Sequence, residues 1–78
     1  MRRAGEVVRV AHGLAVLRSP DDEYVGIGAQ LVDENLDDVG RVVDVFGPVD
    51  RPYLALTPAE GVRPATLVGS VLYDRSGA

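Results

Sequence analysis

The sequence predicts an all-β protein, a small six-stranded β-barrel that is closed or nearly closed. About six short segments rich in Val and Leu are separated by loops that contain Gly, Pro and Asp. No segment is long and periodic enough to predict a helix. Closing a sheet of short strands into a barrel removes its exposed edges, so we favour a barrel over the alternative, a two-sheet sandwich.

The first half of the chain predicts three strands. Residues 5–18 alternate β-branched with other side chains and are interrupted by Gly13, which predicts two strands joined by a turn. Residues 19–26 form a polar loop with one Pro and two Asp, and residues 28–33 predict a short third strand.

The strongest strand pattern lies at residues 39–46. Strict alternation there would put Val43 and Val45 on one face, and Val42 and Phe46 on the other. The remaining expected elements are a turn or single helical turn at 33–38, a strand at 53–57, a loop at 58–64 and a last strand at 69–73.

The chain length and composition limit the class of protein. We expect a single domain over residues 1–78, with an ordered core at about 5–74 and short N- and C-terminal tails. Cysteine is absent, which excludes disulfides and thiolate metal sites. The sequence has no secretory leader pattern and no apolar run that could span a membrane, so we expect a cytoplasmic protein.

The charge composition is acidic and lacks lysine. Twelve Asp and Glu residues face eight basic residues, all of them Arg, for a formal net charge of −4. We favour a cell with a very salty cytosol as the reason, over Arg codon preference in a GC-rich genome. Whichever explanation holds, a net charge of −4 argues against a broad phosphate-binding surface, which needs clustered Lys and Arg.

No residue pattern predicts catalysis, a metal or a cofactor. His12 is the only histidine, and without Cys or Lys it has no evident partner for nucleophilic chemistry, so we expect a structural role. Gly26-x-Gly28 lacks the third Gly of a dinucleotide-binding fingerprint. Residues 33–38 resemble a calcium loop only in their spaced Asp and Asn side chains, and two key positions fail.

A primary RNA-binding role is also disfavoured by the residue pattern. Base stacking needs aromatic and basic residues together on one sheet face. The aromatic residues are Tyr24, Phe46, Tyr53 and Tyr73, and Arg41, Arg51, Arg63 and Arg75 are scattered between and after them.

The segment GPVDRPY, residues 47–53, predicts a stiff loop with an unusual amount of apolar surface. Gly47 permits a backbone conformation closed to other residues, while Pro48 and Pro52 fix their own φ and cannot donate to a ladder. Phe46 and Tyr53 are either core or contact residues, and the core is favoured for Phe46. For Pro48, Val49 and Pro52 we favour a binding surface, because burial within a turn is geometrically hard.

The run VGRVVDVFGPVDRPYLAL, residues 39–56, resembles the signature of the small Gly-Arg-rich protein family of H/ACA ribonucleoproteins. GEVVRVAHGLAVL before it, QLVDENLDDVG and the final VGSVLYD are similar to the same family in order and spacing, so the resemblance covers almost the whole chain. The Gly-Arg-rich tails of eukaryotic members are missing, which makes the chain similar to the archaeal form.

The resemblance implies a six-stranded barrel that is a non-catalytic subunit of an RNA-guided pseudouridine synthase. Such a subunit docks on the dyskerin-type catalytic subunit, contacts the guide RNA complex mostly indirectly, and promotes loading and release of substrate RNA in rRNA modification. Catalysis would belong to an Asp of the synthase, no cofactor would be bound, and we expect a monomer when free. The alternatives are an H/ACA assembly factor and a stand-alone small RNA-binding barrel.

By position, the resemblance implies one set of contacts to the synthase and a weaker second set. The first set is Phe46, Gly47, Pro48, Val49, Pro52 and Tyr53. The second set is Val45, Asp50, Arg51, Leu67, Val68 and Tyr73.

Overall fold

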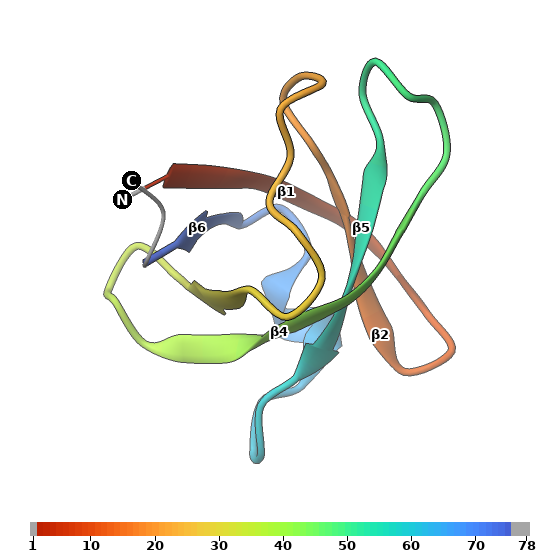
Figure 1. The fold of residues 1–78 in the computed structure, drawn as a ribbon. Helices are drawn as coiled ribbons and strands as arrows, with labels where there is room; N and C mark the ends of the chain where they lie inside the picture. Colours follow the sequence, from red (N-terminus) through yellow and green to blue (C-terminus); the bar gives the residue numbers. More distant parts are fainter. Residues whose placement is uncertain (1, 76–78) are drawn as a thin grey trace.

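A computed structural model describes residues 2–75 as a closed six-stranded antiparallel barrel (Figure 1). The elements are β1 (Arg2–Ala11), β2 (Leu14–Arg18), β3 (Gln30–Val32), β4 (Asp38–Phe46), β5 (Tyr53–Pro58), the 3₁₀ helix η1 (Pro64–Leu67) and β6 (Val71–Asp74). This confirms the predicted all-β class and the barrel rather than the sandwich. Within residues 2–75, no helix is long and apolar enough to cross a membrane.

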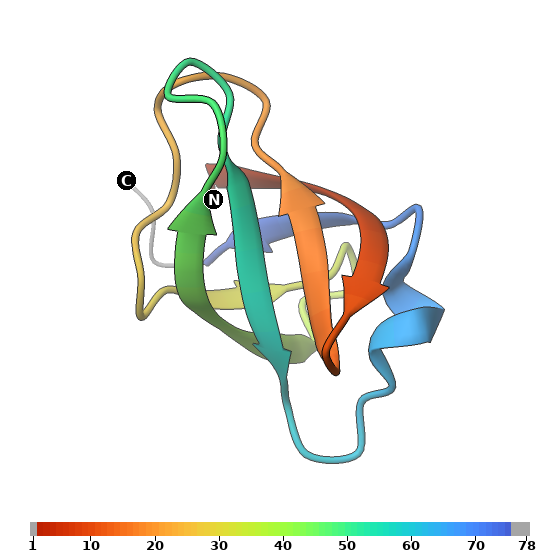
Figure 2. The same ribbon diagram turned by 90° about the vertical axis from the view of Figure 1, so that its right-hand side faces the viewer.

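The strands are arranged around the barrel in the order β1-β2-β5-β4-β3-β6, and β6 closes it by pairing with β1. Figure 2 shows β1, β2, β5 and β4 side by side on one wall. The β1–β2 hairpin turns on His12 and Gly13, which have φ of 54° and 77°. Two central residues at positive φ suit the right-handed twist of a tight hairpin. His12 is therefore one of the two exposed central residues of this turn.

Within residues 2–75, the core is a continuous set of small and branched apolar side chains with no aromatic ring. Every strand contributes, and residue Leu67 from η1 closes one end. The buried cluster consists of Ala4, Val7, Ala15, Leu17, Val25, Leu31, Val39, Val42, Leu54, Leu56, Leu67 and Leu72.

A bulge in β4 overturns the predicted faces of that strand. Val42 pairs with Leu56, but the next pairs are Asp44 with Ala55 and Val45 with Leu54, so one residue of β4 is extra. An extra residue reverses the alternation beyond it. Val42 and Val45 therefore both face inward, Val43 is 41% exposed, and Phe46 lies outside the barrel at 38% exposed. The expectation that Phe46 belongs to the core is wrong.

The ends of the chain also differ from the expected boundaries. The first strand begins at Arg2 rather than residue 5, and the last covers Val71–Asp74 rather than 69–73. The end of the expected C-terminal tail, residues 76–78, lies outside the described residues, as does residue 1.

The loops 19–29 and 47–52 lie at the same end of the barrel, at the top of Figure 2, where one arches beside the other. The backbone N–H of Ser19 donates to the carbonyl of Pro52 at 2.9 Å and ties the two loops together. This end contains the candidate site.

Candidate protein-interaction surface

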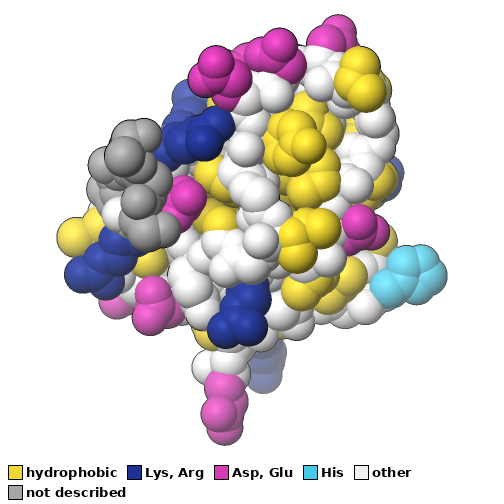
Figure 3. Space-filling view, in the orientation of Figure 1, with side chains coloured by type: hydrophobic (Ala, Val, Ile, Leu, Met, Phe, Trp, Pro, Cys, Tyr) yellow, Lys and Arg dark blue, Asp and Glu magenta, His cyan; other side chains and the backbone are white. Residues whose placement is uncertain are grey.

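All residues of the first predicted contact set except Tyr53 line one concavity of about 260 Å³, which we call the loop surface, and Tyr53 lines a neighbouring pocket. It is lined by Tyr24, Val45, Phe46, Gly47, Pro48, Val49 and Pro52. The end of β4 and the loop 47–52 supply all of these except Tyr24, which comes from the loop 19–29. In Figure 3, apolar side chains gather in the upper right of the face, beneath carboxylates along the top edge.

The loop 47–52 is held in one conformation by hydrogen bonds. The N–H of Arg51 donates to the carbonyl of Pro48 at 3.3 Å and closes a turn. The Nε of Arg51 donates to the carbonyl of Ser19 at 3.1 Å, in addition to the Ser19–Pro52 bond. A loop that is already ordered loses little conformational entropy when a partner binds it.

Gly47 is required by both its backbone and its neighbour. Its φ of +90° is rarely adopted by residues with a side chain. A Cβ at this position would lie 2.9 Å from Cδ2 of Tyr53. The Tyr53 ring is fixed there because it stacks on Phe46, with 5.6 Å between ring centroids and 21° between planes.

Tyr53 is further fixed by arginines on the outside of the barrel. Nη1 of Arg18 donates to its hydroxyl at 2.9 Å, and Cζ of Arg18 lies 4.8 Å from the ring centroid. Cζ of Arg9 lies 5.8 Å from the same centroid. These are cation–π distances, so Tyr53 stiffens the hairpin from outside the core.

The exposure of the loop residues agrees with the sequence-based interpretation, with one exception. Val49 is 90% exposed and Pro48 is also exposed, as expected for a contact surface. Pro52 is buried although it lies outside the core cluster, so it offers less contact surface than we expect from its place in the turn. The reason is the loop 19–29, whose Ser19 is bonded to the Pro52 carbonyl and is itself buried.

The second predicted set is spread over the molecule. Val45 lines the loop surface, Arg51 lines a neighbouring pocket, and Asp50 is exposed in the turn. Leu67 belongs to the core at 7% exposed and offers no contact in this conformation. Val68 and Tyr73 do not line the loop surface, because β6 and η1 lie on other parts of the barrel.

Tyr24 is the residue that the sequence interpretation missed. It is 44% exposed and completes the concavity from a loop more than 20 positions earlier in the chain. An aromatic residue in an otherwise polar loop was the available signal.

The surface has the chemistry of a binding site. Its lining side chains are apolar or aromatic apart from the Tyr24 hydroxyl, and His12 lies at the β1–β2 turn and is not among them. Among residues 2–75, no group of three or more His, Cys, Asp or Glu side chains could hold a metal ion.

Comparison with known proteins gives two relatives. No family model matches the chain. An uncharacterized protein of Methanothermobacter thermautotrophicus is 30% identical in an alignment 77 positions long, which covers 94% of this chain and 82% of that protein. The H/ACA ribonucleoprotein complex subunit GAR1 of Chaetomium globosum is 29% identical over 59 residues, which is 76% of this chain. The match spans 28% of the length of GAR1.

Proposed function

The chain belongs to one family with the Methanothermobacter protein, and we propose that it is a non-catalytic subunit of an H/ACA RNA-guided pseudouridine synthase. The similarity to GAR1 fits a role in RNA modification in general. The specific proposal is that the chain docks on the dyskerin-type catalytic subunit and promotes loading and release of substrate RNA in the cytoplasm.

The observation that carries the proposal is the loop surface. Its side chains Phe46, Pro48 and Val49 are exposed on an acidic protein, yet hydrogen bonds to Ser19 hold the loop in place. Exposed apolar surface with this degree of order is typical of protein–protein contacts. The Phe46–Tyr53 stack gives the surface a defined shape, and the absence of a side chain at Gly47 leaves room for the Tyr53 ring.

The test is complex formation with the purified pseudouridine synthase subunit from the same organism. Gel filtration at low and at multi-molar potassium chloride should give a stoichiometric complex. No complex in either buffer, with this protein folded by circular dichroism, would refute the proposal and favour a stand-alone RNA-binding barrel.

A matched pair of valine variants locates the contact. Val49→Asp puts a charge on the loop surface, and we expect the affinity for the synthase to fall by at least about tenfold. Val10→Asp puts the same charge on an exposed valine of β1, outside the loop surface and outside both predicted contact sets, and should leave the affinity unchanged. Equal losses would place the contact beyond the loop surface.

A further inference from the structure

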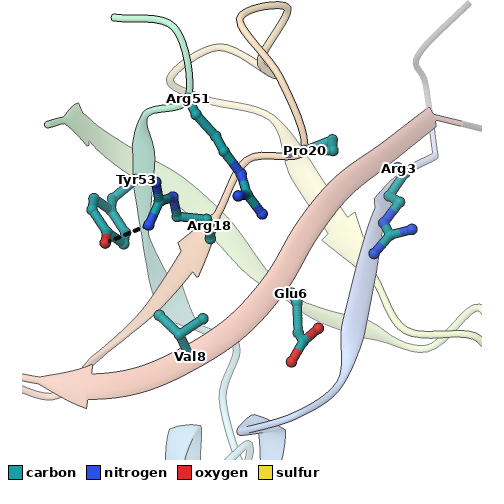
Figure 4. A pocket seen from close by; sticks show the side chains of 7 residues that line it. All are labelled: Arg3, Glu6, Val8, Arg18, Pro20, Arg51 and Tyr53. Atoms are coloured by element: carbon teal, nitrogen blue, oxygen red, sulfur yellow. Dashed lines mark hydrogen bonds between the residues drawn. The ribbon is translucent and has the colours of Figure 1, made fainter. Parts of the chain in front are cut away.

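A second pocket, of about 370 Å³, adjoins the loop surface and contains three arginines. It is lined by Arg3, Glu6, Val8, Arg18, Pro20, Arg51 and Tyr53. Figure 4 shows that Arg3, Glu6 and Val8 project from β1, while Arg18 turns toward Tyr53 and Arg51 reaches in from the β4–β5 loop. Tyr53 stacks on Phe46 of the loop surface, so the two sites share one wall.

Two of the three arginines of this pocket are oriented by neutral groups. Arg18 donates to the Tyr53 hydroxyl at 2.9 Å, and Arg51 donates through Nε to the Ser19 carbonyl at 3.1 Å. Neither bond neutralises the guanidinium charge. Three positive charges face one carboxylate, Glu6, so the pocket has a surplus of two positive charges.

The Arg18 side chain carries one donor that has no acceptor among residues 2–75. Its Nε is buried and has no hydrogen-bond partner within the described part of the chain. Burial of an unpaired polar group is costly, and because the Nε atom is closed to solvent, an anion in the pocket would meet the other N–H groups of the guanidinium. A planar guanidinium is matched in geometry by a carboxylate or a phosphate.

The surroundings favour one compact anion over a nucleic-acid strand. Asp21, Asp22 and Glu23 follow directly on Pro20 of the pocket wall. Nη2 of Arg2 donates to the carbonyl of Glu23 at 2.6 Å, which keeps this acidic segment beside β1. A phosphate backbone would pass these carboxylates and meet a protein of net charge −4, whereas a single carboxylate needs only the pocket.

We propose that this arginine pocket receives an Asp or Glu side chain of the protein that docks on the loop surface. The inference rests on the proposed function. It adds a second contact, between a carboxylate of the partner and the arginine pocket, to the apolar contact at the loop surface. Guanidinium–carboxylate pairing beside an apolar contact fixes the register of docking and speeds encounter.

The test is the affinity for the synthase subunit, measured by calorimetry at two potassium chloride concentrations. We expect the double variant Arg3→Gln, Arg51→Gln to bind at least about tenfold more weakly, with a smaller salt dependence. The control Arg63→Gln removes an exposed arginine at the start of η1, outside the pocket, and should bind as the unaltered protein does.

A second measurement identifies the carboxylate. Double-mutant cycles between Arg51→Gln and Asp→Asn or Glu→Gln variants on the docking face of the synthase should find one acidic residue whose effect is coupled to Arg51. If loss of the Arg51–Ser19 bond unfolds the double variant, Arg3→Gln alone serves, since no intramolecular hydrogen bond fixes the Arg3 guanidinium within residues 2–75.

The outcomes separate the two proposals. Pocket variants that bind the synthase as tightly as the unaltered protein would overturn the carboxylate pocket and leave the docking role intact. Variants that lose affinity for guide RNA but not for the synthase would overturn it in favour of a phosphate site. An unaltered protein that binds no synthase would overturn both.

Discussion

Two connections of this barrel have similar compositions and opposite roles. The loop 47–52 and the segment 59–70 each contain proline, glycine and valine. In the first, Val49 is 90% exposed and stands on the loop surface. In the second, Leu67 is 7% exposed and closes the core.

The difference follows from which strands each connection joins. The loop 47–52 joins β4 to β5, which are neighbours in the sheet, so it has no need to cross the barrel. The segment 59–70 joins β5 to β6, which are separated by two strands in either direction around the barrel. A connection that crosses the barrel end covers the core there, and η1 places Leu67 in it (Figure 2). Topology therefore decides whether an apolar loop residue is core or surface.

The largest expected effect is a stability difference between the two connections. Leu67→Ala should lower the free energy of unfolding by about 2–5 kcal/mol, because it removes a core side chain and leaves a cavity. Val49→Ala should change it by less than about 0.5 kcal/mol. Urea denaturation of both variants measures this, and equal effects would break the comparison.

The second prediction compares the cost in stability of alanine at one glycine of each connection, Gly47 and Gly69. Gly47 and Gly69 share a φ of +90°, but a Cβ would touch Tyr53 only at Gly47, and nothing lies within 4 Å at Gly69. Alanine at either site should cost about 1–2 kcal/mol for the backbone conformation. Gly47→Ala should cost more than Gly69→Ala by the strain on the Tyr53 ring. Thermal unfolding in parallel gives the difference, and a larger loss at Gly69 would contradict the fixed position of Tyr53.

The smallest expected effect tests the outer support of the loop surface. Tyr53→Phe keeps the stack on Phe46 but removes the hydroxyl that accepts from Arg18, and should cost about 0.5–1.5 kcal/mol. Tyr73→Phe on β6, away from Arg18, is the matched control and should cost less than about 0.5 kcal/mol. If the two variants are equally stable in urea, the Arg18–Tyr53 bond does not hold the hairpin.

Much of the fold was predictable because its signals are local. The β-branched alternation placed most strands within a few residues, and the Gly13 break placed the first hairpin turn. The predicted faces of β4 failed because a bulge depends on the partner strand, and Val43 carries no mark of being the extra residue. The 3₁₀ helix at 64–67 was missed because four residues are too few for a periodic pattern.

For the candidate site, the sequence alone determined the stiff apolar loop, since Gly47 and the two prolines restrict the backbone wherever the loop lies. It also determined that Pro48 and Val49 are exposed.

Only the tertiary structure decided three other features. It buried Pro52 against Ser19, brought Tyr24 to the loop surface, and gathered Arg3, Arg18 and Arg51 into one pocket. The physical reason is barrel closure, which brings together residues that are far apart in the sequence. No local sequence pattern predicts such contacts.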